Sequence, residues 1–186
     1  MIYDRTGNRK YLTRDERLRF IRAAQDQSGL VETFCLTLTY TGARISEVLA
    51  LRVANVYLTG GLITIESLKK RRKGVFRQIP VPDQLLNRLE NEHMLTKAYP
   101  NARLWTWSRT TAWKLVKSVM EDAAVPSFCA TPRALRHAFG VIGVAEAQVP
   151  LHMVQKWLGH SRIETTAIYA NAVGAEERSI AHRMWN

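Results

Sequence analysis

Apolar residues recur at helical spacing along most of this chain of 186 residues. Thr13, followed by Asp15 and Glu16, is typical of a helix N-terminus, and the nearly all-apolar run over residues 31–40 predicts a central helix. Other helices are expected to begin near Arg44, Pro82, Ser108, Thr131, Val149 and Gly174. The pattern therefore predicts a mainly α fold.

Between residues 53 and 82 the period changes to two, which indicates strands. Three runs are expected to be extended, over residues 53–57, 62–65 and 75–81, with glycine-containing turns between them. The prediction is a small three-stranded antiparallel β-sheet within the helical fold.

The stretch Leu158–Ala170 predicts a junction between two helices. A Gly-His pair ends the first helix, and Ser161 with Glu164 has the S-x-x-E spacing of a capping box that opens the second. Tyr169 is expected about two turns into that second helix.

The net charge of the chain indicates which kinds of molecule it binds. Lys and Arg number 27 against 16 Asp and Glu, which gives a net charge of +11 and favours a polyanion, either nucleic acid or an anionic membrane surface. No apolar run is long enough to cross a bilayer, and the N-terminus is polar, so we expect a cytoplasmic protein with access to DNA. Cys35 and Cys129 lack metal or redox spacing and are expected to be buried thiols.

The Tyr169 phenol is a poor nucleophile at neutral pH because its ordinary pKa is about 10. It would become useful if cationic groups gathered around it, and the sequence contains several candidates. Arg133, Arg136 and His137 project together near a helix N-terminus, where free backbone N–H groups favour an anion. The spacing of Arg44 and Glu47 allows two interpretations. They form a surface ion pair, or Glu47 orients Arg44 toward an anion.

Two further basic segments are expected to face DNA. The turn Lys69–Lys73 carries five successive cations; most are expected to contact phosphates only, and one lysine could donate a proton to a reacting group. The helix after Ser108 has a basic face with aromatics, which suits a helix that faces DNA, although a core position is the commoner explanation of Trp113 and is the one expected here.

Four segments in order resemble the tyrosine recombinase, or phage integrase, family. They are TGARISEVLAL (41–51), the basic hairpin (68–74), PRALRHAFG (132–140) and LGHSRIETTAIYA (158–170), in which the tyrosine follows the histidine by nine positions. The resemblance runs from about residue 12 to 186 and implies the catalytic-domain fold of that family.

By this resemblance, Tyr169 attacks a DNA phosphodiester and forms a 3′-phosphotyrosyl link. Arg44 and Arg136 would clamp the non-bridging oxygens, and His160 would bind the phosphate or assist the proton transfer of the tyrosine. Lys69 would protonate the leaving 5′-oxygen, with Lys70 as the alternative because the hairpin register is ambiguous by one residue.

The implied catalytic set is Tyr169, Arg44, Arg136, His160, Lys69 and Arg133, and the supporting set is Glu47, Lys70 and His137. The residues expected to bind DNA are Lys70, Arg71, Arg72, Lys73, Arg109, Lys114, Lys117 and Arg162. The sequence shows no metal-ligand spacing, and the resemblance implies neither a metal nor a cofactor.

The sequence departs from the family in two respects. Arg133 occupies a position that is usually His and sometimes Lys; a guanidinium donates hydrogen bonds but cannot exchange protons, and we favour a donor role. The catalytic fold is also expected over residues 12–173, after an exposed arm (1–11) and without an N-terminal core-binding domain, as in Fim-type invertases. A last helix (174–186) would pack on a neighbouring protomer or on its own core.

The sequence thus predicts a site-specific recombinase for integration, excision, inversion or resolution. Its rivals are a DNA-binding module of the same fold that lacks the chemistry and a type IB topoisomerase-like relaxase. The expected partners are double-stranded DNA, further copies of the chain (dimer to tetramer) and accessory DNA-bending proteins, in the nucleoid of a bacterium or archaeon.

Overall fold

A computed structural model of the chain describes residues 2–68, 74–171, 182 and 185. Its helices are α1 (Arg14–Gln25), α2 (Gly29–Thr41), α3 (Ile45–Leu49), α4 (Asp83–His93), α5 (Arg109–Asp122), α6 (Pro132–Val141), α7 (Leu151–Leu158) and α8 (Glu164–Ala167). Short 3₁₀ turns cover Val53–Asn55 and Ile168–Asn171, and a π-helical turn, Ile142–Glu146, follows α6. The strands β1 (Val56–Tyr57), β2 (Leu62–Glu66) and β3 (Phe76–Pro80) form one antiparallel sheet in the order β1-β2-β3. The predicted fold class is confirmed.

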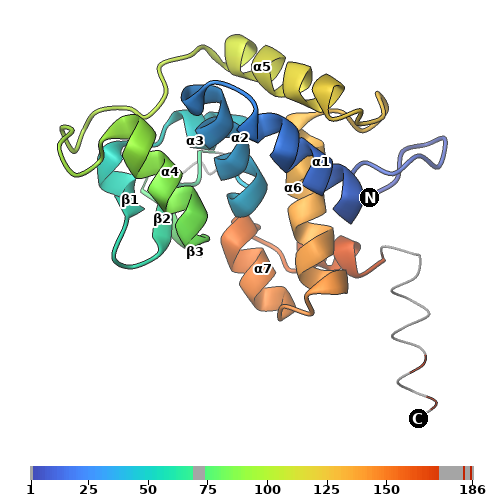
Figure 1. Ribbon diagram of the computed structural model, residues 1–186. Coiled ribbons are helices and arrows are strands. Elements are labelled where there is room, and N and C mark those ends of the chain that lie inside the picture. The colour runs from blue at the N-terminus through green and yellow to red at the C-terminus, as the bar shows by residue number, and fades with distance from the viewer. Residues whose placement is uncertain (1, 69–73, 172–181, 183–184, 186) are drawn as a thin grey trace.

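The apolar helix α2 is the centre of the fold. It packs against α1, α4 and α6, and its side chains from residue 31 to residue 39 are all buried. Helix α5 crosses one end of this core, α7 lies at the other end, and the sheet lies beside α4 (Figure 1). Burial on all sides explains why residues 31–40 read as a continuous apolar run.

The predicted helix starts at Thr13, Ser108 and Thr131 are confirmed. Each side chain accepts a hydrogen bond from a backbone N–H in the first turn of its helix, and Thr13 forms a full capping box with Glu16. Such a cap is worth about 1 kcal/mol to its helix.

The capping box predicted for Ser161 and Glu164 is wrong. Helix α8 follows Ile163, whose backbone is already helical and whose side chain makes no cap. The helix therefore starts too late for the hydroxyl of Ser161 to stand at its N-cap, and Tyr169 lies in the 3₁₀ turn that follows it.

Two other expectations need correction. Residues 53–57 are a 3₁₀ turn followed by a two-residue strand, because the side chain of Asn55 accepts a hydrogen bond (2.8 Å) from the backbone N–H of Arg52 and closes the turn. The N-terminal arm is not wholly exposed, since Ile2 is 3% exposed and packs in a cluster that includes Val154 and Tyr169.

Some predictions fall where the structure gives no description. The cationic turn Lys69–Lys73 lies outside the described residues, and so does the helix expected over 174–186 except for His182 and Trp185. Cys35 and Cys129 are free and buried, as expected. In the part of the chain that the structure covers, no helix has the length and apolar character needed to cross a membrane.

Candidate active site

A cavity of about 580 Å³ brings together residues from distant parts of the chain. Its lining includes Arg44, Arg133, Arg136, His137, His160 and Tyr169, together with Lys10, Arg109 and Trp113. The sequence-predicted catalytic residues in the described segments therefore share one site, built where α3, α5 and α6 begin and where the chain passes from α7 to the turn after α8.

Arg44 is held by Glu47 at the start of α3. The backbone N–H of Arg44 donates to Oε2 of Glu47 (2.9 Å), and its Nη1 donates to Oε1 (2.8 Å). The Glu47 side chain is fully buried while that of Arg44 is 32% exposed, so this is not a surface ion pair. Burial by itself raises the pKa of Glu47, but the charges of Arg77 and Arg44 outweigh it and keep that pKa below its usual value. Of the two interpretations left open by the sequence, the geometry supports orientation of Arg44 by Glu47.

Arg136 lies deeper in the same cavity. Its Nη1 donates to the carbonyl oxygen of Gly42 (2.8 Å) and its Nη2 to that of Leu158 (2.7 Å), so it joins the end of α2 to the end of α7. Burial, followed by the charge of Arg44, lowers the pKa of Arg136 to about 10. The guanidinium remains cationic at neutral pH, and because these hydrogen bonds go to neutral carbonyls its charge is available to an anion.

Tyr169 is packed tightly between His160 and α6, the helix that carries His137. It is 1% exposed, its phenol oxygen lies 3.2 Å from Nδ1 of His137, and its ring stacks on that of His160 at 6.3 Å. A Cβ on Gly140 would lie 2.4 Å from the Tyr169 ring, so the glycine allows this close approach. Burial raises the pKa of Tyr169, and the charges of Arg136 and Arg44 oppose that rise.

Both histidines are neutral at physiological pH. Burial lowers the pKa of His137 to about 4, with a smaller contribution from the charges of Arg133 and Arg136. Burial and the arginines likewise lower the pKa of His160 to about 4, and its Nδ1 lies 3.0 Å from the hydroxyl of Thr166. A neutral imidazole has one nitrogen that can accept a proton, so either ring can serve as a base.

The α5 side of the cavity differs from expectation at Trp113. The prediction that Trp113 is a core residue is wrong, because it is 44% exposed and lines the cavity near Arg109. Helix α5 buries Ala112 and Val116, and the next residue after Ala112 points about 100° away around the helix. Lys114 is exposed, and Lys117 lies 3.9 Å from Glu121 on the same helix.

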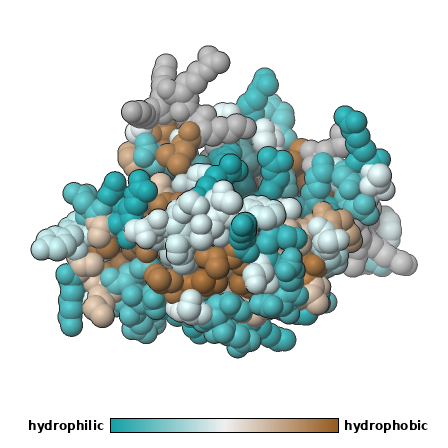
Figure 2. All heavy atoms as spheres, turned by 90° about the horizontal axis from the view of Figure 1, so that it is seen from above, coloured by the Kyte–Doolittle hydropathy of each residue, from teal (hydrophilic) through white to brown (hydrophobic). Residues whose placement is uncertain are grey.

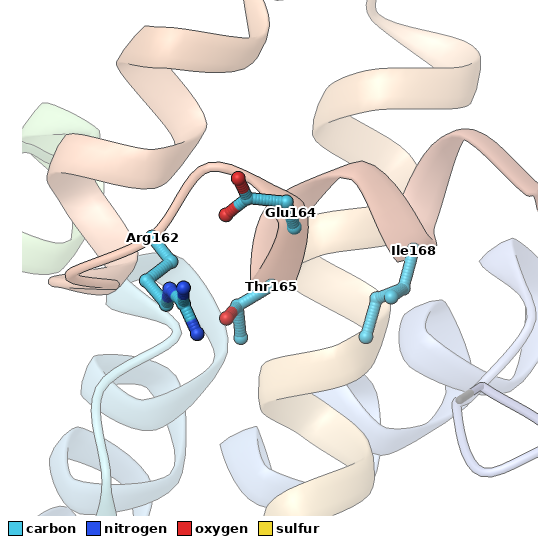
Figure 3. A pocket seen from close by; sticks show the side chains of 4 residues that line it. All are labelled: Arg162, Glu164, Thr165 and Ile168. Atoms are coloured by element: carbon cyan, nitrogen blue, oxygen red, sulfur yellow. The ribbon is translucent and has the colours of Figure 1, made fainter.

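Arg162 lies beside the main cavity rather than in it. A second hollow of about 470 Å³ is lined by Arg162, Glu164, Thr165 and Ile168, and the last two also line the main cavity. Arg162, Thr165 and Ile168 point to one side of the α8 segment, and Glu164 points to the other (Figure 3). The position suits contact with a polyanion that extends past the cavity.

Sequence reasoning missed two cationic residues near this site. Lys10 lines the cavity, and Arg77 on β3 is buried and donates to Oε2 of Glu47 (2.7 Å). Arg77 is two residues from the buried Ile79 in a strand, so alternation could have placed it on the inner face, where a charged side chain needs a partner. Lys69 and Lys70 lie outside the described residues, and their placement relative to the cavity stays a prediction.

The surface over α5 is mixed rather than uniformly polar. In the view onto this side, hydrophilic side chains surround strips of hydrophobic ones (Figure 2). Among the residues with a described placement, no three His, Cys, Asp or Glu side chains are grouped so that they could hold a metal ion.

A family model described as "Phage integrase family" matches residues 10–175. The chain is 26% identical over 183 residues to "Tyrosine recombinase XerA" of Pyrococcus furiosus, covering 94% of this chain and 61% of that protein. It is 29% identical over 151 residues to "Tyrosine recombinase XerD" of Yersinia pestis, covering 75% of this chain and 49% of that protein. The chain thus spans about half to three fifths of the length of these relatives.

Solved structures share the fold. The crystal structure of XerA recombinase superposes with a TM-score of 0.80 at 23% identity, covering 94% of this chain and 64% of that chain. The catalytic domain of bacteriophage HP1 integrase superposes with a TM-score of 0.65 at 20% identity, covering 92% of this chain and 93% of that domain. The predicted catalytic-domain fold is confirmed.

Proposed function

Because the chain belongs to the phage integrase family, that of the tyrosine recombinases, we propose that it breaks and rejoins DNA in site-specific recombination. The observation that carries the proposal is the convergence of the buried Tyr169, Arg44, Arg136 and two neutral histidines on a single cavity. These groups are what attack on a phosphodiester requires: a nucleophile, a base near it and positive charge for the phosphoryl oxygens.

In the proposed reaction, the phenol oxygen of Tyr169 forms a bond to phosphorus as the bond from phosphorus to the 5′-oxygen breaks. Arg44 and Arg136 stabilise the charge that builds on the non-bridging oxygens, since a guanidinium fork matches that geometry. The phenol proton passes to a neutral imidazole, and His137 is the histidine already within hydrogen-bonding distance of it.

The departing 5′-oxygen takes a proton from Lys69 or Lys70, as the family resemblance implies. The 5′-hydroxyl of another strand then attacks the phosphotyrosine, and the same steps in reverse rejoin the DNA. The phosphotyrosyl bond conserves the energy of the broken phosphodiester, so rejoining needs no separate energy source.

Arg133 is assigned the role of a hydrogen-bond donor to the phosphate. It is exposed and lines the cavity, whereas Arg136 on the same helix is buried. The two neutral histidines supply proton acceptors elsewhere in the site, so the reaction does not depend on acid–base chemistry at Arg133.

Similar proteins support DNA and further copies of the chain as partners. One fold neighbour is XerH recombinase bound to its difH substrate (TM-score 0.73, 19% identity), and another is a lambda integrase dimer bound to a core site (TM-score 0.61, 18% identity). For this chain we propose a dimer to tetramer on double-stranded DNA in the nucleoid, with accessory DNA-bending proteins. The basic residues Arg109, Lys114 and Arg162 would contact the DNA backbone.

The test is covalent attachment to DNA. The purified chain is incubated with duplexes that carry the inverted repeats flanking its gene, and adducts that resist detergent are separated from free DNA. An adduct confined to one sequence supports recombination, whereas relaxation of any supercoiled plasmid would favour a relaxase. Binding without an adduct on the true site would favour a DNA-binding module.

A further inference from the structure

Arg77 contacts three separate parts of the site at once. From the middle of β3, its Nη2 donates to Oε2 of Glu47 (2.7 Å), its Nη1 to the hydroxyl of Ser67 (3.0 Å) and its Nε to the carbonyl oxygen of Trp157 (2.7 Å). Each of its three guanidinium nitrogens is thus engaged, and its side chain is only 4% exposed.

These contacts reach three segments around the site: α3, the residue after β2, and the last turn of α7. Glu47 holds Arg44, Ser67 follows the last residue of β2, and Trp157 lies three residues before His160. Arg77 is therefore a fixed link between the carboxylate that holds Arg44, the residue that follows β2 and the helix end that leads to His160.

The turn before His160 packs directly on Arg77. A Cβ on Gly159 would lie 3.2 Å from Cδ and Nη1 of Arg77 and 3.2 Å from the hydroxyl of Ser67. Gly159 also has a positive φ of 67°, which a side chain would strain. A shift of the guanidinium would therefore displace the backbone that positions His160.

Stability alone is a weak reason for an arginine at this place. Both members of the Arg77–Glu47 pair are buried, and desolvation offsets much of the attraction within such a pair, so a well-packed apolar pair is often as stable. Oε1 of Glu47 accepts from the Arg44 side chain, and Oε2 accepts both from Arg77 and from the backbone N–H of Arg44. The charge and direction of Arg77 therefore fix the carboxylate that orients Arg44.

We propose that Arg77 is a positioning residue that aligns Arg44 and His160 on the scissile phosphate. The inference rests on the proposed function. Lysine cannot replace Arg77, because an ammonium keeps the charge but cannot reach three acceptors in the directions of the guanidinium fork.

The experiment measures the single-turnover rate of adduct formation on a nicked duplex to which the unmutated chain attaches. Arg77→Lys should slow this rate about tenfold or more, since it loses charged hydrogen bonds, while the Kd for the duplex changes less than about twofold. Ser67→Ala, which removes one acceptor without a change in charge, should show a smaller defect. Arg88→Lys is the matched control, because Arg88 pairs with Glu32 away from the site, and should react at the unmutated rate.

A neutral methylphosphonate at the scissile position separates positioning from simple damage to the fold. It lacks the negative charge that Arg44 would neutralise, so the defect of Arg77→Lys should shrink on it, and the defect of Arg44→Lys should shrink in the same way. An equal defect on both substrates, or no defect, would overturn the inference. If Arg77→Lys does not fold, Ser67→Ala is compared in the same way and decides the matter.

The two proposals fail in different ways. If the unmutated chain forms no adduct on its true site, the proposed function is wrong and the role of Arg77 is wrong with it. If the unmutated chain reacts and Arg77→Lys reacts equally fast, only the role of Arg77 is overturned.

Discussion

The phenol oxygen of Tyr169 lies 3.2 Å from Nδ1 of His137, within hydrogen-bonding distance. The lowered pKa of His137, about 4, keeps that ring neutral at physiological pH, so the phenol can donate its proton to Nδ1. The family resemblance points to His160 for assistance to the tyrosine, whereas the geometry puts His137 at the oxygen and His160 against the face of the ring.

His137→Gln should therefore slow adduct formation. A glutamine can still donate and accept hydrogen bonds but cannot take the phenol proton, and loss of a general base costs on the order of a hundredfold or more in rate. Single-turnover kinetics on the nicked duplex measure the effect. His152→Gln, on an exposed histidine of α7, is the control and should react normally. Equal rates for the two variants would remove His137 from proton transfer.

Gly140→Ala should inactivate the site by displacing the nucleophile. The added Cβ would meet three atoms of the Tyr169 ring at 2.4 to 2.6 Å, so the ring must move. We expect a loss of adduct formation together with a destabilisation of about 1–3 kcal/mol, measured by urea unfolding.

Gly143→Ala is the matched control for that variant, because its Cβ would meet a methyl group of Val154 at 3.2 Å and does not approach the tyrosine. It should retain adduct formation. Normal adduct formation by Gly140→Ala would contradict the tight packing of Tyr169 on α6.

Stability should depend on pH through His137. The pKa of this histidine falls from its ordinary 6.5 to about 4 on folding, so between these values the unfolded chain binds a proton that the folded chain does not. The free energy of unfolding therefore decreases as pH falls from about 6.5 toward 4. Urea unfolding of the unmutated chain and His137→Gln across this range should show a shallower slope for the variant. Identical slopes would mean that His137 is not kept neutral by folding.

Another hydrogen-bond donor at position 133 should preserve part of the activity, whereas removal of the donor should abolish most of it. Because the side chain is exposed, Arg133→Lys and Arg133→Ala should each change the free energy of unfolding by less than about 0.5 kcal/mol. Arg133→Lys should retain part of the adduct rate, since an ammonium still donates to phosphate, and Arg133→Ala should lose most of it. An unchanged rate for Arg133→Ala would exclude contact with the reacting phosphate.

Most helix starts could be predicted from the sequence because local chemistry specifies them, whereas the candidate catalytic residues came from the resemblance of four motifs to a family. Thr13 and Thr131 are N-cap residues that a sequence pattern can identify, and the cationic residues at the start of α6 are close together in the sequence. The candidates His160 and Arg136 line the same cavity as Tyr169, and their catalytic roles stay predictions.

The features that sequence patterns did not predict depend on how the helices and strands pack against one another. Trp113 is exposed because α5 turns another face to the core, and Arg77 is buried because β3 lies between α7 and Glu47. Ser161 carries a capping pattern, yet the turn from α7 starts the next helix two residues later. Such outcomes are set by tertiary contacts that no local pattern records.

The most direct test of the account is the identity of the residue that joins DNA. The unmutated chain and Tyr169→Phe are incubated with a duplex that carries the recombination site and a nick next to the scissile phosphate, so that the cut fragment diffuses away. The substitution removes only a hydroxyl and its hydrogen bond, so the variant should remain folded. We predict an adduct from the unmutated chain, with the phosphate mapped to the peptide that contains Tyr169, and none from the variant. An adduct from Tyr169→Phe, or none from the unmutated chain on its true site, would contradict the account.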